Sequence, residues 1–240
     1  MSVFERCLEK CRARKGAVVY SDGEDRRVVS AAAKLIREGL VEPILIGDPE
    51  KVRTALQESG ETGVSLQVVN PYNPALLQHN AAEYMAIQKA KGKDISEEEA
   101  VKAVKNPLAA GALMVRRGEA EIGVAGNLSS TADVIRAGLR MVGTAAGSKT
   151  VSSFFFMLKD NRVCMFTDCA VIPEPTSAQL ADIAISTADV YKRVMGDEAR
   201  VALLSFSTKG SAKHERVDKV RAALEEIKTR EPNLLVDGEL

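Results

Sequence analysis

The chain has 240 residues, of which 45% are hydrophobic and 4% aromatic, and it contains no tryptophan. Its 33 basic and 33 acidic residues cancel to a formal net charge of zero, so no overall field would attract nucleic acid or an anionic membrane. The few aromatic rings also offer little stacking surface for a single nucleic-acid strand. We therefore expect neither nucleic acid nor a membrane as a partner.

The amino-terminal segment, MSVFERCLEKCRARKG, mixes charges throughout instead of forming the apolar stretch of a secretory signal. No later run approaches the ~18 apolar residues of a membrane span. These features favour a soluble cytoplasmic protein.

Strand and helix signals alternate along the first part of the chain. Strands are predicted at 17–20, 43–47 and 64–69, and helices at 25–39 and 49–59. This alternation favours an α/β fold with a mainly parallel sheet and helices on both faces.

The stretch from 74 to 118 is almost wholly helical in pattern, with interruptions near Lys91 and at Asn106. Asn106 is suited to cap a helix that starts with Pro107. The apolar run 120–125 then predicts a buried strand, and 131–139 a further helix.

Small and polar residues in GTAAGSKT, 143–150, predict a domain boundary. We expect a first α/β domain at 1–146 and a second at 147–240. In the second, strands are predicted at 151–158, 163–166, 200–206 and 234–236, and helices from Thr176 or Ser177 to 195 and at 215–230. The chain stops at LLVDGEL with no closing helix, so we expect the second domain to be incomplete at its carboxyl end.

Polar residues follow the apolar run at 122–125 in the stretch GNLSSTADVIRAG. A strand, a hydroxyl-rich turn and a helix place backbone N–H groups at the carboxyl edge of a sheet, where α/β folds bind ligands. Ser129, Ser130 and Thr131 add donors, which favours phosphate as the ligand, and Arg136 adds a bidentate cation. Residue chemistry alone gives more weight to a simpler alternative, in which Ser130 or Thr131 is an N-cap and Arg136 a solvated charge.

A second strand runs into a donor-rich loop in LLSFSTKGSAKH, 203–214. Its candidate substrate-binding residues are Ser207, Thr208, Lys209, Gly210 and Ser211. The spacing is not that of a Walker A loop. Two such loops in successive α/β units suggest a ligand that lies between the units.

The acidic stretch YSDGEDRR, 20–27, has two interpretations. Asp22, Glu24 and Asp25 could bind magnesium, but acids in a first helical turn also complement the helix dipole, and we prefer the dipole interpretation.

The cysteines do not suggest a metal site, because Cys7 and Cys11, and Cys164 and Cys169, have x3 and x4 spacing instead of the x2 of zinc knuckles. Cys169 follows Asp168, but no histidine lies near it in the sequence to activate it as a nucleophile. We expect it to pack as a small hydrophobic residue.

Five segments, taken in order, carry a resemblance to a known family: VAGNLSSTADVIRAGLRMVGT, KTVSSFFFML, FTDCAVIPEPTSAQLADIA, VALLSFSTKGSAK and LLVDGEL. Together with EDRRVVSAAAKLIREGLVEPILIGDP they closely resemble the phosphate acetyltransferases (phosphotransacetylases) over nearly the whole chain. The wording GNLSSTA is most similar to the branch associated with ethanolamine utilisation.

The resemblance implies two α/β domains with an active cleft between them, and a homodimer. It implies reversible acetyl transfer between coenzyme A and phosphate, with acetyl phosphate as the other partner, and no bound cofactor or metal. Arg136 would contact coenzyme A, Ser129–Thr131 would line the phosphate and acyl site, and 207–211 would form the opposite wall. A bacterial microcompartment is a possible location within the cytoplasm.

Two departures from the family pattern bear on activity. Gln88 stands where relatives have a further coenzyme-binding arginine, a role that Lys89 or Lys91 could take. The family's serine–arginine pair and the aspartate thought to act as general base fall beyond DGEL, so no catalytic residue is assigned within the chain.

Three alternatives to an active acetyltransferase stay open. One is a non-catalytic paralogue or assembly subunit that retains the fold, and another is a phosphate butyryltransferase-like enzyme. A dehydrogenase of the isocitrate type would share the two-domain layout, but it needs clustered carboxylates and a nucleotide loop, and neither is convincing here.

Overall fold

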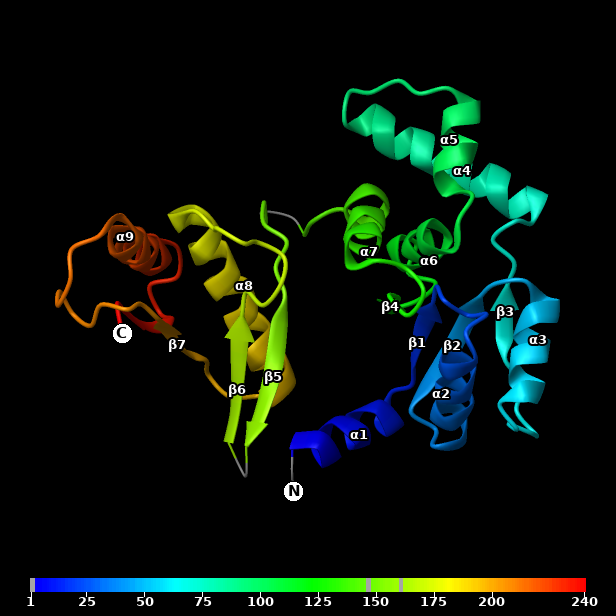
Figure 1. Ribbon diagram of the computed structural model, residues 1–240, viewed down its shortest axis with the longest axis horizontal. Coiled ribbons are helices and arrows are strands. Elements are labelled where there is room, and N and C mark those ends of the chain that lie inside the picture. Colours follow the sequence, from blue (N-terminus) through cyan, green and yellow to red (C-terminus); the bar gives the residue numbers. More distant parts are fainter. Residues whose placement is uncertain (1–2, 146–147, 160–161) are drawn as a thin grey trace. The chain divides into compact units, whose positions relative to one another are not determined.

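A computed structural model describes residues 3–145, 148–159 and 162–240 (Figure 1). The chain divides into an amino-terminal unit, Leu8–Gly143, and a carboxy-terminal unit, Thr144–Leu240 with Met1–Cys7. The predicted domain boundary between 146 and 147 falls on residues outside the described part. The first helix, α1 (Val3–Ala13), was not predicted from the sequence.

The amino-terminal unit contains a parallel four-stranded sheet in the order β3-β2-β1-β4. The strands are β1 (Gly16–Tyr20), β2 (Val41–Ile46), β3 (Gln67–Val69) and β4 (Ile122–Val124). The α/β class and the parallel sheet predicted from the alternating pattern are therefore confirmed.

The helices of this unit begin and end near the predicted positions. They are α2 (Arg26–Arg37), α3 (Pro49–Glu58), α4 (Pro74–Ala90), α5 (Glu97–Val104), α6 (Pro107–Arg116) and α7 (Thr131–Ala137), followed by a π-helical turn, η1 (Gly138–Val142). The predicted cap at Asn106 is confirmed, since its side-chain oxygen accepts the Ala109 N–H at 2.9 Å. This cap fixes where α6 starts, and the first turn of α6 lies at the site described below.

Alternate residues of β2 bury against helices on opposite faces of the sheet, as the two-residue period of a strand requires. Ile44 and Ile46 pack with α6 in one cluster, whereas Leu45 packs with α2 and α3 in another. Each fully buried side chain of this size stabilises the fold by about 1.5–3 kcal/mol. The unit is thus a three-layer α/β/α sandwich (Figure 1).

The strand predicted at 120–125 is present as β4, but the expectation that it is buried was wrong. Within the described residues β4 pairs only with β1, at the edge of the sheet, and Ile122 and Val124 are 56% and 43% exposed. An apolar run reports β-propensity, but an edge strand lacks the neighbour that would bury it.

The carboxy-terminal unit combines a hairpin with a parallel pair. Its elements are β5 (Phe154–Lys159), β6 (Arg162–Thr167), α8 (Ser177–Met195), β7 (Arg200–Leu203), α9 (Glu215–Arg230) and β8 (Leu235–Gly238). β5 and β6 are antiparallel, whereas β7 and β8 are parallel and joined through α9. The helix predicted to begin after Thr176 is confirmed, and Thr176 and Gln179 form a capping box.

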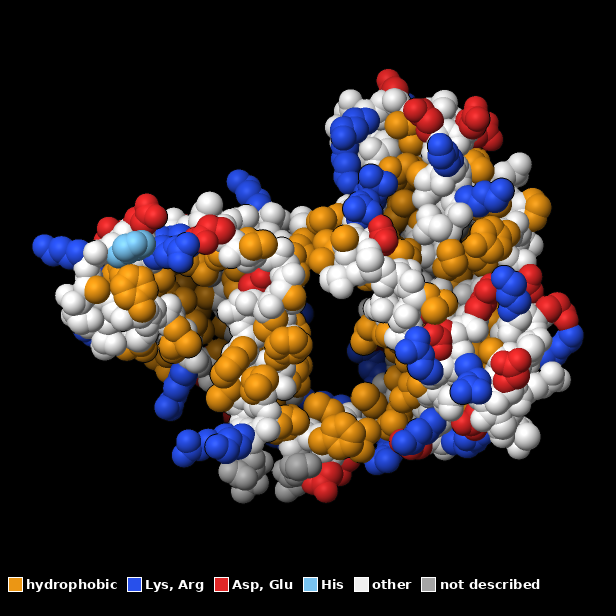
Figure 2. Space-filling model, viewed as in Figure 1, with side chains coloured by type: hydrophobic (Ala, Val, Ile, Leu, Met, Phe, Trp, Pro, Cys, Tyr) orange, Lys and Arg blue, Asp and Glu red, His pale blue; other side chains and the backbone are white. Residues whose placement is uncertain are grey.

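Exposed hydrophobic side chains concentrate on the β5–β6 hairpin, where Figure 2 shows them clustered on the surface. They include Phe155, Leu158 and Phe166, which are 60%, 57% and 58% exposed. Among the helices of the described ranges, none is both long and apolar enough to cross a membrane.

Candidate functional site

A cavity of about 550 Å³ opens in the amino-terminal unit beside the residues that follow β1. Its polar and charged lining residues are Ser21, Asp22, Glu24, Lys51, Tyr72, Asn106, Ser129, Ser130, Asp133, Arg136 and Arg140. Three of the four residues predicted from this unit, Ser129, Ser130 and Arg136, therefore meet at one hollow. Thr131, the fourth, begins α7 and does not belong to the lining.

The turn that follows β4 is held by a carboxylate from the neighbouring strand end. Asp22 accepts the N–H groups of Gly126 at 2.8 Å and Asn127 at 2.9 Å, and its other oxygen lies 3.5 Å from the Ser129 hydroxyl. The expectation that this turn presents free N–H groups is therefore wrong for Gly126 and Asn127. Gly126 has a φ of 109°, a conformation that residues with a Cβ rarely adopt.

The backbone next to Asp22 is closely packed against β2. A Cβ on the next residue, Gly23, would lie 2.7 Å from the carbonyl oxygen of Ile46. The Asp22 side chain is buried, with the residue only 7% exposed. A buried carboxylate with two N–H donors has its charge satisfied without a cation.

Ser130 and Arg136 both contact Asp133. The Ser130 oxygen accepts the Asp133 N–H at 3.2 Å as the N-cap of α7, and its hydroxyl donates to the Asp133 carboxylate at 2.7 Å. Arg136 pairs with the same carboxylate at 2.5 Å. The Ser130 hydrogen bond, and then Arg136, hold the pKa of Asp133 below its usual value.

Of the two interpretations of this stretch, the N-cap role is confirmed for Ser130. Arg136 was interpreted as either a ligand contact or a solvated charge. In the structure its side chain is half-exposed and forms an ion pair with Asp133. The two residues nevertheless line the cavity, so capping and ligand contact are compatible for them.

The cavity also contains residues that the sequence patterns did not single out. Lys51 of α3 pairs with Glu24 at 3.1 Å, and the hydrogen bond to Glu24 raises the Lys51 pKa. Arg140 belongs to η1, four residues after Arg136. That spacing, which places residues on one face of a helix, was the available signal for Arg140.

Asp22 and Asp25 of the acidic stretch 20–27 have different structural roles. Asp25 is the N-cap of α2, accepting the Arg27 N–H at 2.8 Å, and the Arg27 side chain lowers the Asp25 pKa to about 2. Asp25 thus fits the helix-start interpretation. Asp22 fits neither alternative, since it binds the β4–α7 turn.

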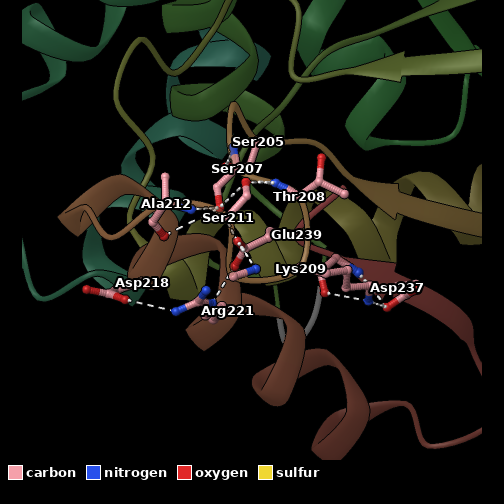
Figure 3. A network of polar contacts seen from close by, with 12 residues as sticks. Ser205, Ser207, Thr208, Lys209, Ser211, Ala212, Asp218, Arg221, Asp237 and Glu239 are labelled. Carbon is pink, nitrogen blue, oxygen red and sulfur yellow. Dashed lines mark hydrogen bonds and ion pairs between the residues drawn. The ribbon is translucent and has the colours of Figure 1, made fainter.

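The loop at 205–211 surrounds a second buried carboxylate, Glu239, which is 2% exposed (Figure 3). Glu239 accepts from the Ser207 hydroxyl, from the Gly210 N–H at 2.9 Å and from Arg221 of α9. The Ser207 hydrogen bond is the main reason that the pKa of Glu239 is lowered to about 2, with Gly210 and Arg221 adding to it.

Most of the predicted ligand donors of this loop have partners within the loop's own network (Figure 3). Ser207 is fully buried, and the Ser211 oxygen accepts the Thr208 N–H at 2.9 Å. Lys209 pairs with Asp237 and thereby lowers the pKa of that aspartate. The geometry assigns these residues to holding the loop, and their predicted substrate contacts stay a prediction.

Asp168 and Cys169 lie in the connection between β6 and α8, where the Cys169 N–H donates to the Ser153 hydroxyl at 3.1 Å. Asp168 accepts N–H groups of Ser153, Val171 and Ile172 at 2.6–3.0 Å. Burial alone would raise the Asp168 pKa, but these N–H groups and the Ser153 hydroxyl outweigh it, so the pKa falls to about 2. In the part of the chain that the structure covers, no three His, Cys, Asp or Glu side chains gather as a metal site would require.

The chain is similar in sequence to known proteins over nearly its whole length. The family described as "Phosphate acetyl/butaryl transferase" matches residues 2–240. A phosphate acetyltransferase from Thermoanaerobacterium thermosaccharolyticum is 37% identical over 246 residues, covering 100% of this chain and 74% of that protein. One from Clostridium acetobutylicum is also 37% identical, with 100% and 73% covered.

Solved structures agree with the sequence matches. A phosphotransacetylase from Streptococcus pyogenes superposes with a TM-score of 0.91 at 36% identity, over 99% of this chain and 72% of that one. The EutD phosphotransacetylase from Staphylococcus aureus gives 0.88 at 31% identity, over the same shares. The chain therefore belongs to the phosphate acetyltransferase family.

Proposed function

We propose that this chain transfers an acetyl group reversibly between coenzyme A and inorganic phosphate, with acetyl phosphate as the phosphorylated partner. The observation that carries the proposal is the family match over residues 2–240. The cavity beside β1 supports it, because phosphate and coenzyme A are anions and the lining contains Lys51, Arg136 and Arg140.

The chemistry needs no covalent enzyme intermediate. A base removes the thiol proton of coenzyme A, and the thiolate attacks the acetyl carbonyl of acetyl phosphate. The carbon–sulfur bond forms, the carbon–oxygen bond to phosphate breaks, and phosphate leaves with the electron pair. Cations and N–H groups stabilise the charge that develops on the carbonyl oxygen and the leaving phosphate.

The amino-terminal unit supplies binding and orientation in this proposal. Ser129 and Ser130 line the wall on which phosphate would rest, and Arg136 would contact coenzyme A. Asp22 keeps that wall in place through Gly126 and Asn127. Orientation of this kind accelerates a reaction between two bound substrates by removing the entropy of bringing them together.

The test is to mix the 240-residue chain with acetyl phosphate and coenzyme A and to follow thioester formation. Formation of acetyl-coenzyme A would support the proposal, and Arg53→Gln, a surface variant outside the cavity, should then give the same rate as the wild type. Coenzyme A binding without turnover would favour the non-catalytic paralogue instead. Turnover would also mean that the chain supplies its own general base, against the expectation drawn from the family pattern.

The acyl group is tested in the same assay with propionyl and butyryl phosphate. We propose acetyl as the preferred group on the basis of the 34–37% identity to phosphate acetyltransferases. Faster transfer of butyryl would instead favour the butyryltransferase-like alternative.

We also propose a homodimer, which sedimentation equilibrium would test. The exposed Phe155, Leu158 and Phe166 of the β5–β6 hairpin support it, because an apolar patch of this kind is commonly buried in an interface. The link to ethanolamine utilisation and to a microcompartment stays a prediction.

A further inference from the structure

One face of α7 and η1 borders the cavity with a regular spacing. The lining residues from this segment are Asp133, Arg136, Ala137, Arg140 and Met141. Separations of three and four residues place side chains on one helical face. Met141 is buried in the cluster formed by α4, α5 and α6, so this anchor fixes the orientation of the turn that carries Arg140.

Of the cations Lys51, Arg136 and Arg140 that line the cavity, the first two have ion-pair partners among the described residues. Lys51 pairs with Glu24, and Arg136 pairs with Asp133. Asp22 has its acceptors occupied by N–H groups of the turn. The exposed side chain of Arg140 makes no ion pair or hydrogen bond with any residue in the described ranges.

A second positive feature borders the same cavity. Its lining includes Asn106, Pro107, Leu108 and Ala109, the cap and first turn of α6. The amino terminus of a helix carries a partial positive charge. An anion entering the cavity would therefore meet Arg140 and this helix end without first breaking an ion pair.

We propose that Arg140 binds a phosphate group of coenzyme A and is a substrate-binding residue in addition to Arg136. The inference rests on the proposed function, which makes coenzyme A the ligand. Coenzyme A carries a diphosphate and a separate 3′-phosphate. Arg136 and Arg140 lie about one helical turn apart, so their guanidinium groups can contact different phosphate groups of one molecule.

Calorimetric titration with coenzyme A tests the assignment in Arg140→Gln. We expect binding about tenfold weaker than in the wild type, the change that follows from losing one charge-assisted hydrogen bond. Arg140→Lys keeps the charge but loses the bidentate geometry, so its affinity should lie between the two. Arg53→Gln removes one exposed, ion-paired arginine of α3 outside the lining and controls for net charge.

Titration with 3′-dephospho-coenzyme A identifies the phosphate that is bound. If Arg140→Gln and the wild type bind this analogue equally, Arg140 contacts the 3′-phosphate. If the variant stays about tenfold weaker, Arg140 contacts the diphosphate. Both outcomes support the inference.

Unchanged affinity of Arg140→Gln for coenzyme A would overturn the inference and leave the proposed function intact. A wild-type chain that binds no coenzyme A would overturn both. Melting temperatures equal to that of the wild type are expected for all three variants, because none of these side chains is buried.

Discussion

The two donor-rich loops of this chain are built alike and differ in how much of their chemistry is left for a ligand. In each, a buried carboxylate from another part of the same unit fastens the loop. Asp22 accepts two N–H groups of the turn after β4, and Glu239 accepts a hydroxyl and an N–H of the loop after β7. Both loops had been predicted as ligand cradles from the same pattern.

The difference lies in charge and exposure. Glu239 has Arg221 as a counter-ion, and Ser207 is fully buried beside it. The turn after β4 borders a cavity of about 550 Å³ that also contains Arg136 and Arg140. A strand followed by hydroxyl residues therefore indicates a loop whose polar groups need hydrogen-bond partners. Where buried protein groups are those partners, as at Glu239, the loop has few donors left for a ligand.

The largest effect is expected for Glu239→Gln in the carboxy-terminal unit. The folded-state pKa is about 2, below the ordinary 4.5, so the charged carboxylate stabilises the fold above pH 4.5. This contribution is lost as the pH falls from 4.5 towards 2. We expect Glu239→Gln to have a lower melting temperature than the wild type at neutral pH. The difference between the two melting temperatures should become smaller as the pH falls.

The measurement is thermal unfolding of the wild type and of Glu239→Gln from neutral pH down towards pH 2. A constant gap at every pH would mean that the charge of Glu239 plays no part, and that only the shape of the side chain matters. Arg53→Gln removes an exposed ion pair outside both loops. The difference between its melting temperature and that of the wild type should not depend on pH.

The next effect is expected for Asp22→Ala in the amino-terminal unit. Its removal leaves the N–H groups of Gly126 and Asn127 without their acceptor, at a cost of about 2 kcal/mol. Urea unfolding should show this loss, and coenzyme A affinity should fall because the turn relaxes. Asp22→Asn keeps an oxygen acceptor, so it should lose less stability and less coenzyme A affinity than Asp22→Ala. Equal losses in the two variants would contradict the hydrogen-bond explanation.

A smaller effect is expected for Arg136→Ala, which should change ligand binding and leave stability almost unchanged. The Arg136 side chain is 53% exposed and pairs with Asp133. Because Arg136 lines the cavity, Arg136→Ala should weaken coenzyme A binding about tenfold. The melting temperature should barely change, because exposed ion pairs contribute little to stability. Calorimetric titration and a thermal melt on the same sample check both statements, and unchanged affinity would reject the assignment.

The smallest effect is expected for Ser130→Ala. Loss of an N-cap destabilises a helix by about 1 kcal/mol, and the affinity for phosphate should weaken as well because Ser130 lines the cavity. Phosphate titration of the folded variant distinguishes the two roles. Normal phosphate affinity in a destabilised variant would leave the cap as its only role.

The sequence was informative wherever local chemistry decides the outcome. Asn106 and Thr176 were recognised as caps because capping depends on a few neighbouring residues. The parallel sheet followed from alternating periods, and the family followed from the order of five segments. Ser129, Ser130 and Arg136 were predicted as substrate-binding residues, and the structure places them in the lining of one cavity.

Long-range pairing was not readable from one sequence. Asp22 lies more than a hundred residues from Gly126, and no local pattern announces that contact. The exposure of β4 depends on strand order, which places it at the edge of the sheet. The burial of Ser207 likewise depends on Glu239, which is 32 residues away in the sequence and follows β8 at the same end of the β7–β8 pair.

The most direct test of the central claim is a crystal structure of this chain with coenzyme A. We expect the phosphate groups of the ligand in the cavity of the amino-terminal unit, with Arg136 and Arg140 as their contacts and Ser129 on the adjoining wall. Coenzyme A bound elsewhere, with this cavity containing only solvent, would contradict the account.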